Sequence, residues 1–344
     1  MIISSGMKVF VTGASGRIGK TVVRKLASSG LQVKAFDRAV PEQKLPGVEY
    51  ANGDINDFNF LLRHMKGADA VVHLAALPGP EMGTSQEIIR INVLGTFNVF
   101  RTAVENGVKK IVQASSINAL GAAYNIRKFK VQYFPIDEGH PSSLTDPYAL
   151  SKKMGEEVAE YFWNKDSLSS FSLRFPSVID TSNLKFWFKD KELAMKAINE
   201  LEEMGVEERL HLMDEVFRNM ESINQEVKKR RILGKDAPPI QMKLVMENVI
   251  LWSGKEFWTY LDFNDCAQSV LKSLQADVEG AHPLFICAAN NGMGYETKRL
   301  ISIFFPDVRT FKKEIKGAET AVSIDKAVKL TGFAPEYTIG PEGK

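Results

Sequence analysis

The sequence predicts an α/β protein in which a doubly wound parallel sheet is joined to a smaller, partly helical C-terminal part. Three observations predict this fold class. A glycine-rich turn joins a short apolar strand to a helix near the N-terminus. Strand and helix patterns then alternate up to about residue 180, and two amphipathic helices follow in the middle of the chain.

The first strand, Lys8–Thr12, leads directly into a glycine loop, Gly13–Gly19. A helix follows over Thr21–Leu26, and Gly30 ends it. Glycines at a strand-to-helix turn let the backbone approach a pyrophosphate, while the helix N-terminus offers unpaired N–H groups and a partial positive charge. The loop therefore predicts a dinucleotide-binding site of the Rossmann type.

The second strand, Gln32–Phe36, is followed by Asp37, which stands 18 residues beyond Gly19. A carboxylate at this distance can accept hydrogen bonds from both hydroxyls of the adenosine ribose. This favours NAD as cofactor, because the 2′-phosphate of NADP would meet a like charge. Arg17 and Arg38 flank the same pocket and could offset part of that repulsion, so NADP is the alternative.

Composition limits the kind of protein. The 344 residues, 44% of them hydrophobic, could form one large domain or two modest ones. The net charge of +2 gives no reason to expect a nucleic-acid or membrane partner. Cys266 and Cys287 have neither disulfide nor metal-site spacing, so we expect inert core thiols and no bound metal. Met1–Gly6 lacks the basic region of a signal peptide and no apolar run is long enough to span a bilayer, so we expect a cytoplasmic protein.

The third strand, Val48–Tyr50, delivers Asp54 and Ile55 to the same edge of the sheet. Asp54 could accept a hydrogen bond from the adenine amino group, and Ile55 could pack on the ring. The alternative for Asp54 is the N-cap of a helix over Phe58–Met65. The sequence leaves both interpretations open.

The fourth strand, Ala70–Leu74, ends at Ala75–Ala76, whose small side chains leave room for backbone to pass close to a ligand. We expect His73 to be a packed, hydrogen-bonded histidine rather than a catalyst. A helix over Ser85–Asn106 contains Asn92, a polar residue among apolar neighbours. Such an asparagine is expected to bracket two strands by hydrogen bonding their backbones.

The residues that suggest catalysis begin at Asp146 and Pro147, which suit the N-cap and the first position of a helix. Tyr148 and Lys152 are four apart and share one face of that helix. A tyrosine with its ordinary pKa of about 10 is a poor base at neutral pH. The lysine ammonium, together with an oxidised nicotinamide, is expected to lower that pKa. Ser116, at the carboxyl end of the preceding strand, would hydrogen-bond the same substrate oxygen.

These motifs resemble the extended branch of the short-chain dehydrogenases/reductases, in particular the NAD-dependent sugar epimerase/dehydratase family. The resemblance covers most of the chain except its middle. It rests on Thr12–Gly19, Gly53–Ile55, His73–Ala76, Asn92–Thr96, Ser115–Gly121, Tyr148–Lys152 and Leu173–Pro176, with weaker matches at Tyr260–Asp265, Ser323–Ala327 and Gly332–Pro335.

The resemblance implies a role for each matching residue. Tyr148 would be the acid/base, Lys152 its electrostatic partner and ribose ligand, and Ser116 the group that binds the substrate oxygen. Phe175–Pro176 would lie beside the nicotinamide. The expected NAD site comprises Gly13, Gly16, Arg17, Ile18, Gly19, Asp37, Arg38, Asp54, Ile55, Leu74, Ala75, Ala76, Asn92, Ala114, Tyr148, Lys152, Phe175 and Pro176.

Departures from the family pattern bear on the reaction. Dehydratases of this family carry an Asp-Glu pair directly after the serine or threonine, whereas this chain has Ile117 and Asn118, so dehydration is disfavoured. Nucleotide-sugar epimerases typically hold the diphosphate with an asparagine and an arginine at the positions of Ser177 and Trp258. Without the guanidinium a natural diphosphate clamp is missing, although Lys255 or a residue of the central insertion could replace it.

The central insertion runs over about residues 183–246 and holds two amphipathic helices, Asp190–Met204 and Val206–Arg231. A lid over a substrate cleft, a subunit contact and an ordinary packed hairpin are all compatible with them. The basic run Lys228–Arg231 is expected to be a solvated helix end. The apolar stripe of the second helix comprises Met213, Val216, Phe217, Met220, Ile223 and Val227.

A loop over Tyr124–Tyr133 separates Ser116 from Tyr148 and is rich in basic residues. These side chains, Arg127, Lys128 and Lys130, could meet an anionic substrate or form plain surface.

We therefore expect an NAD-binding Rossmann domain over residues 1–180, with a later return near 258–275, and a substrate-binding part over 181–344. The resemblance implies an NAD-dependent sugar or nucleotide-sugar epimerase or oxidoreductase. The alternative is an NAD-dependent dehydrogenase of a free sugar or uronic acid. A catalytically silent dinucleotide sensor is the least favoured class, because the chain keeps both Tyr148 and Lys152. The resemblance also implies a homodimer formed through the helices that begin near Ser85 and Pro147.

Overall fold

The computed structural model describes residues 6–125, 129–182, 191–232 and 245–339. Its centre is a seven-stranded sheet in which every neighbouring pair of strands is parallel. The strand order is β3-β2-β1-β4-β5-β6-β9, so the chain runs outward from β1 in one direction and then from β4 in the other, as a doubly wound sheet does. The strands are β1 (Lys8–Thr12), β2 (Gln32–Asp37), β3 (Val48–Asn52), β4 (Ala70–His73), β5 (Lys110–Ser116), β6 (Ser169–Phe175) and β9 (Ala281–Phe285).

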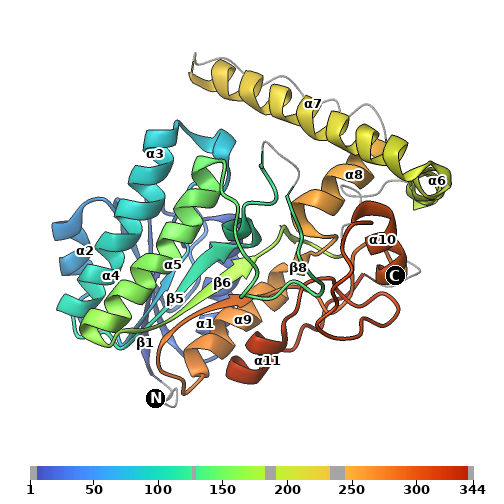
Figure 1. The fold of residues 1–344 in the computed structure, drawn as a ribbon. Coiled ribbons are helices and arrows are strands. Elements are labelled where there is room, and N and C mark those ends of the chain that lie inside the picture. The colour runs from blue at the N-terminus through green and yellow to red at the C-terminus, as the bar shows by residue number, and fades with distance from the viewer. Residues whose placement is uncertain (1–5, 126–128, 183–190, 233–244, 340–344) are drawn as a thin grey trace.

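Helices cover both faces of this sheet (Figure 1). One face packs on α1 (Arg17–Ser28), α9 (Phe263–Gln275) and α11 (Asp325–Thr331), and the apolar residues between them form one core. The other face packs on α2 (Phe58–His64), α4 (Gly95–Glu105) and α5 (Pro147–Asp166), around a second core. Burial on both faces explains why Val9–Val11 of β1 and Ala70–Val72 of β4 are continuous apolar runs.

A third core lies in the C-terminal part, beyond the carboxyl ends of the strands. Four helices contribute to this core: α6 (Lys191–Glu203), α7 (Val206–Ile232), α8 (Val245–Glu256) and α10 (Thr297–Phe304). The C-terminal part also contains a two-stranded sheet of β7 (Val178–Ile179) and β8 (Leu261–Asp262). Helix α8 contacts the short helix η3 (Ile117–Leu120) that follows β5, and α7 contacts the short helix η1 (Pro80–Met82) that follows β4. The C-terminal part therefore lies over the edge of the sheet at which parallel sheets bind ligands.

The structure contains the two helices predicted for the central insertion, as α6 and α7, and adds α8, which the sequence analysis did not predict. Of the predicted apolar stripe on α7, Met213 and Val216 are buried and Phe217 is partly buried. The side chains of Met220, Ile223, Val227 and Lys228–Arg231 lie outside the described residues, as do Arg127 and Lys128, whereas Lys130 is exposed.

The alternative that Asp54 caps α2 does not hold, because Asp57 caps it instead: its carboxylate accepts a 2.9 Å hydrogen bond from the Phe60 backbone N–H. The predicted helix over residues 85–106 is confirmed up to Glu105, and it contains a π-helical turn, η2 (Arg90–Leu94), between α3 (Ser85–Ile89) and α4.

Cys266 and Cys287 are free and buried, and burial raises the pKa of both thiols. Both are therefore poor nucleophiles in this structure.

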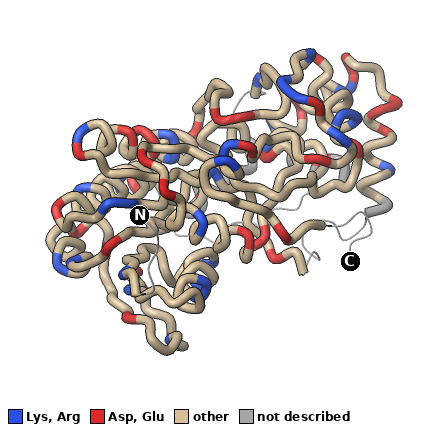
Figure 2. The backbone as a smooth tube through the Cα atoms, turned by 90° about the horizontal axis from the view of Figure 1, so that it is seen from below, with Lys and Arg blue, Asp and Glu red and all other residues tan. Residues whose placement is uncertain are grey.

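Lys and Arg residues are interspersed with Asp and Glu residues along the described backbone (Figure 2). Within the described residues, no helix is both long and apolar enough to span a membrane.

Candidate active site

The glycine loop fits a pyrophosphate. Gly13 has φ 69°, and a Cβ placed on it would lie 2.5 Å from the Ala75 nitrogen, so the loop needs glycine there to lie against the end of β4. A Cβ on Gly19 would overlap the Gly13 carbonyl oxygen. Among the described residues no side chain caps the N-terminus of α1 at Gly16, and the first turn carries no acidic residue. Its N–H groups and partial positive charge therefore suit an anionic ligand.

The ribose-binding carboxylate predicted at Asp37 lies at the end of β2, against the same loop. It accepts hydrogen bonds from the Ser15 backbone N–H at 2.9 Å and from the Ala39 N–H at 3.4 Å. Arg17 and Arg38 are both exposed, and the Arg17 guanidinium lies 5.5 Å from the centroid of the Phe263 ring. The structure thus brings Asp37 to the glycine loop and leaves the two arginines at the rim.

The predicted adenine site lies next along this edge. Asp54 accepts hydrogen bonds from the Asn56 backbone N–H at 2.8 Å and from its side-chain amide at 2.9 Å. Burial raises the pKa of Asp54, but these bonds and the charges of Arg38 and Arg90 bring it below its ordinary value. The Ile55 side chain is only 5% exposed and packs at Gly95, so little of it can face a bound ring.

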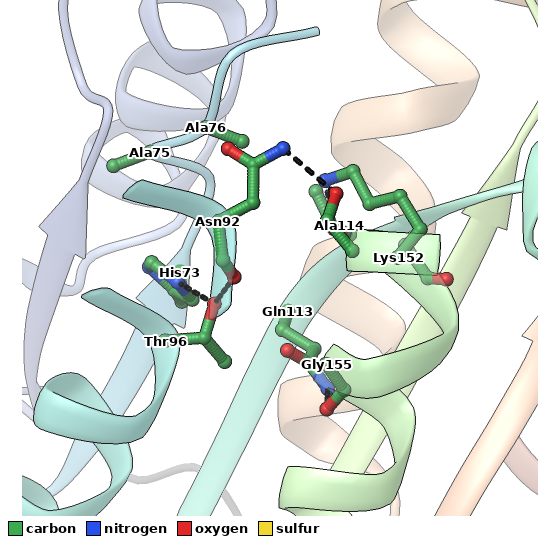
Figure 3. A pocket seen from close by; sticks show the side chains of 11 residues that line it. His73, Ala75, Ala76, Asn92, Thr96, Gln113, Ala114, Lys152 and Gly155 are labelled. Carbon is green, nitrogen blue, oxygen red and sulfur yellow. Dashed lines mark hydrogen bonds between the residues drawn. The ribbon is translucent and has the colours of Figure 1, made fainter. Parts of the chain in front are cut away.

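Asn92 lies in the π-helical turn and joins a loop to a helix rather than two strands. Its Oδ1 accepts from Leu77 N–H at 2.8 Å, and its Nδ2 donates to the Leu77 carbonyl and the Ser151 hydroxyl, both at 3.0 Å. Figure 3 shows Asn92, Ala114 and Lys152 converging at a small cavity. Asn92 therefore fixes the segment after β4, which holds Leu74, Ala75 and Ala76, to α5.

His73 is a packed, hydrogen-bonded histidine, as predicted. Its ring nitrogens bond the hydroxyls of Thr12 at 2.7 Å and Thr96 at 3.0 Å. Burial, and after it the charge of Lys152, lower the pKa of His73 to about 3, so the ring is neutral near pH 7. It connects β1, β4 and α4 beneath the site.

Ser116 and Tyr148 meet at the carboxyl end of β5. Asp146 caps α5 as predicted, because its carboxylate accepts from the Ala149 N–H at 2.8 Å, and this places Tyr148 in the first turn. Ser116 Oγ donates to the Phe175 carbonyl at 3.4 Å and accepts from the Asn118 N–H at 3.1 Å, and the Ser116 hydroxyl is near enough to Tyr148 to lower the pKa of its phenol. Tyr148 is 8% exposed.

The expected lowering of the Tyr148 pKa depends on an oxidised nicotinamide as well as on Lys152, and the surrounding protein groups alone act in the opposite direction. Burial raises the pKa of Tyr148 most, the Ser116 hydroxyl lowers it, the carboxylates of Asp146, Glu81 and Glu256 raise it, and the net result is a pKa of about 12. Desolvation disfavours the phenolate more than the nearby hydroxyl stabilises it.

Lys152 lies one turn along α5 from Tyr148, with its Nζ 5.7 Å from the Tyr148 ring centroid. The ammonium donates a 2.8 Å hydrogen bond to the Ala114 carbonyl. Burial lowers the pKa of Lys152 to about 8, and the charge of Glu156 opposes that shift. The three proposed catalytic side chains are thus brought to one place by β5 and α5.

Beneath them lies a buried polar network that the sequence analysis missed. The Glu156 carboxylate accepts from Ser115 Oγ at 2.7 Å, from Arg174 Nε at 2.9 Å and from Arg174 Nη2 at 2.8 Å. Arg174 and Glu156 are 4% and 7% exposed, and removing either would leave a buried charge unpaired. The network ties α5 to β5 and β6, and so positions Phe175 and Pro176, which are buried at the end of β6. The four-residue spacing from Lys152 to Glu156 was the available sequence signal.

A protein-family model described as the NAD dependent epimerase/dehydratase family matches residues 9–203. The chain belongs to this family. Its relatives include a putative UDP-glucose 4-epimerase of Methanocaldococcus jannaschii, 32% identical over 176 residues, and an NAD-dependent glucose-6-phosphate dehydrogenase of Haloferax volcanii, 30% identical over 179 residues.

These two matches cover 49% and 48% of this chain, and 55% and 66% of the respective relatives. Among solved structures, MoeE5 in complex with UDP-glucuronic acid and NAD superimposes with a TM-score of 0.58 at 20% identity, covering 98% of each chain. The structural likeness establishes a shared fold over almost the whole chain, including the part that the two sequence matches leave out.

The structure shows the surroundings of Ser177 and Trp258, the two positions at which nucleotide-sugar epimerases of the family are expected to hold the diphosphate. Trp258 is fully buried in the C-terminal core, with its ring 5.5 Å from that of Phe304. Ser177 binds Glu256, whose Oε1 accepts from the Ser177 N–H at 2.9 Å and from its hydroxyl at 2.8 Å. Glu256 was not predicted, since 79 residues separate it from Ser177.

Lys152→Met should increase the free energy of unfolding of the protein at pH 7. With its pKa lowered from 10.5 to about 8, the buried ammonium destabilises the folded state below pH 8, and this cost disappears as the pH rises toward 10.5. The shift corresponds to roughly 3 kcal/mol. Chemical denaturation of both proteins from pH 7 to 9.5 should show the stability advantage of the variant shrinking with pH. An advantage that does not change with pH would contradict the lowered pKa.

Proposed function

We propose that the chain oxidises a hydroxyl-bearing carbon of a sugar or nucleotide sugar with NAD, and that Ser116, Tyr148 and Lys152 carry the proton chemistry. The observation that carries this proposal is the proximity of Ser116, Tyr148 and Lys152, whose Nζ lies 5.7 Å from the Tyr148 ring centroid, at the same sheet edge as the glycine loop. Membership of the NAD-dependent family supports the choice of cofactor.

The cofactor would be held by groups that the structure already arranges. The first turn of α1 would bind the pyrophosphate, Asp37 the adenosine ribose and Lys152 the nicotinamide ribose. When bound, NAD supplies an oxidised nicotinamide that can accept a hydride from the substrate carbon.

Tyr148 would accept the hydroxyl proton as the substrate carbon is oxidised. The Ser116 hydroxyl would hold the same substrate oxygen, and the Lys152 ammonium would favour the phenolate electrostatically. If the carbonyl product stays bound, turns its other face and takes back both the hydride and the proton, the latter from Tyr148, the outcome is epimerisation. If the carbonyl product leaves, the protein is a dehydrogenase.

A dehydrogenase of a free sugar or uronic acid is the second candidate. It is favoured by the burial of Trp258 and by the engagement of Ser177 with Glu256, because neither residue then serves a diphosphate. The relative from Haloferax volcanii, named as a glucose-6-phosphate dehydrogenase, supports a sugar substrate without a nucleotide.

The test follows absorbance at the NADH band while the protein and NAD are offered free sugars, uronic acids and nucleotide sugars. Steady NADH accumulation indicates a dehydrogenase. Conversion of a nucleotide sugar to its epimer without net NADH indicates an epimerase. Neither oxidation nor epimerisation of any sugar in a broad panel would contradict the proposal.

We also propose a homodimer through the α3–α5 face. An apolar groove there is lined by side chains of α3, η2, α4 and α5, including Ile89, Val93 and Phe97. Large apolar side chains on the same helices are exposed: Leu94 by 50%, Met154 by 38% and Tyr161 by 47%. Such a face is typical of a subunit contact.

Met154→Glu should convert the dimer into a monomer by placing a charge in this face. The matched control is Met195→Glu on α6, where the native side chain is 49% exposed outside the groove, and it should leave the dimer intact. Sedimentation velocity at micromolar concentration distinguishes the two. A monomeric wild-type protein would contradict the dimer.

A further inference from the structure

Glu156 stands one helical turn beyond Lys152 on α5, and the two side chains bond neighbouring residues of β5. Lys152 Nζ donates to the Ala114 carbonyl at 2.8 Å, and Ser115 Oγ donates to the Glu156 carboxylate at 2.7 Å. The next residue of the strand is Ser116. The helix is therefore fixed to the strand directly before the serine that is proposed to bind the substrate oxygen.

The same carboxylate fixes the neighbouring strand, β6. Arg174 donates to Glu156 from Nε at 2.9 Å and from Nη2 at 2.8 Å. In the sheet, Arg174 stands opposite Ser115, and the next pair along is Phe175 opposite Ser116. The Ser116 hydroxyl donates to the Phe175 carbonyl at 3.4 Å. Glu156 thus holds both strands immediately before the pair of residues that orients the Ser116 hydroxyl.

The ion pair of Glu156 and Arg174 is shielded from water, because both residues are buried. The Arg174 guanidinium lies 5.0 Å from the Phe285 ring centroid, and the Phe285 N–H donates to the Glu138 carboxylate at 2.8 Å. On its other side Glu156 meets Lys153, whose Nζ lies 3.8 Å away. Replacing a buried ion pair by apolar residues of similar volume often leaves a protein equally stable. The geometry that the pair imposes therefore explains it better than stability does.

The charge of Glu156 also acts on Lys152. Burial lowers the pKa of Lys152 to about 8, and the charge of Glu156 opposes that shift. The Tyr148 ring centroid lies 5.7 Å from the Lys152 ammonium. Of the described residues that line the small cavity beside Lys152, the other titratable one is His73, whose buried ring is neutral near pH 7. Glu156 therefore favours the ammonium form of Lys152 near neutral pH.

Resting on the proposed function, we propose that Glu156 is a positioning residue of this site. Its carboxylate holds the ends of β5 and β6 through Ser115 and Arg174, and it keeps a negative charge one helical turn from Lys152. It acts on the reaction through the Ser116 hydroxyl and the Lys152 ammonium. Loss of its reach would misplace the first of these groups, and loss of its charge would deplete the second.

Two variants separate reach from charge. Glu156→Asp keeps the charge and shortens the side chain, so kcat should fall by about 10²-fold, as misplacement of reacting groups does, while the pH profile of kcat/KM keeps its wild-type position. Glu156→Gln keeps the length and removes the charge, so the alkaline decline of kcat/KM should move to lower pH as Lys152 loses its proton more readily. Glu200→Gln on α6, where the side chain is 47% exposed, is the control and should change neither quantity.

A merely structural role would lower kcat in both Glu156 variants and leave the pH profile of each in place, which would overturn the proposal. Turnover that is unaffected in both variants would also overturn it. Absence of turnover with every sugar in the wild-type protein would overturn the proposed function as well as this role in it, whereas turnover without the expected effects would overturn the role alone.

A second measurement needs neither NAD nor substrate. Glu156→Gln leaves the Arg174 charge buried without its partner, so the double variant Glu156→Leu/Arg174→Met, which removes both charges at similar volume, should fold where the single variant does not. Of this pair, Glu156 is the residue whose charge acts on Lys152. Chemical denaturation from pH 6 to 9.5 compares the stability advantage of Lys152→Met in the wild-type and double-variant backgrounds.

In the double-variant background the advantage of Lys152→Met should be larger at pH 6 and should begin to shrink at a lower pH. The reason is that the buried ammonium has lost its favourable neighbour, so the folded state releases the Lys152 proton more readily. An advantage with the same size and the same pH dependence in both backgrounds would overturn the proposal.

Discussion

Tyr148→Phe is expected to reduce turnover by about 10²- to 10⁴-fold, the contribution typical of a general acid/base, with NAD affinity nearly unchanged. The substitution removes only the phenolic hydroxyl and keeps the ring, which packs edge-on against Tyr124. The helix start is unaffected, because Asp146 caps it through the Ala149 backbone. The measurement is kcat for the preferred substrate, together with the Kd of NAD from quenching of intrinsic fluorescence.

The control is Tyr337→Phe in the C-terminal part, where the native side chain is 43% exposed outside the proposed dimer face. It should have wild-type kcat. Full activity of Tyr148→Phe, with the protein folded by its thermal melt, would remove the acid/base assignment from Tyr148.

Asp37→Ala is expected to weaken the binding of NAD by about 10²-fold, because two hydrogen bonds from ribose hydroxyls to a carboxylate are lost. The binding of NADP should be weakened far less, since the removed charge would have repelled its 2′-phosphate. The carboxylate also accepts from the Ser15 N–H, so part of the loss will reflect a looser glycine loop and will be common to both cofactors.

Titrating NAD and NADP into wild type and Asp37→Ala separates the two effects, because only the difference between cofactors reports on the ribose. Asp307→Ala, at an exposed position, is the control and should leave both affinities unchanged. Equal weakening of NAD and NADP by Asp37→Ala would refute the assignment of Asp37 to the ribose.

Features set by short-range chemistry could be predicted from the sequence. The N-terminal strand, glycine loop and helix follow from residues that are adjacent in the chain, and the start of α5 follows from Asp146 and Pro147. The N-cap of α2 could not be predicted in the same way. Asp57 caps this helix rather than Asp54, because its carboxylate is the one that reaches the Phe60 N–H, and sequence pattern does not distinguish two acids three residues apart.

Features that depend on distant contacts could not be predicted. Asn92 was expected to bracket strands, but a π-helical turn directs it to Leu77 and Ser151 instead. Strand β9 pairs with β6, whose residues are more than 100 positions away in the chain. Helix α8 packs in the C-terminal core. The pairing of Glu256 with Ser177 bridges 79 residues, and no local signal marks it.

The same limit applies to the electrostatics of Tyr148. Sequence spacing placed Lys152 one turn away, which favours a lowered pKa for the tyrosine. In the structure, burial raises the pKa of Tyr148 most, and the carboxylates of Asp146, Glu81 and Glu256 raise it as well. Two of these three carboxylates come from segments far from Tyr148 in the chain, so only the folded structure reveals their charges at the site.

The most direct test of the central claim is a single-turnover experiment in which excess protein, saturated with NAD, is mixed with the best substrate of the panel. Wild-type protein should show a transient or lasting NADH band that forms more slowly when the reacting carbon carries deuterium, and in Tyr148→Phe the band should form about 10²- to 10⁴-fold more slowly. Tight binding of NAD and substrate without any NADH band in the wild-type protein would contradict hydride transfer at this site.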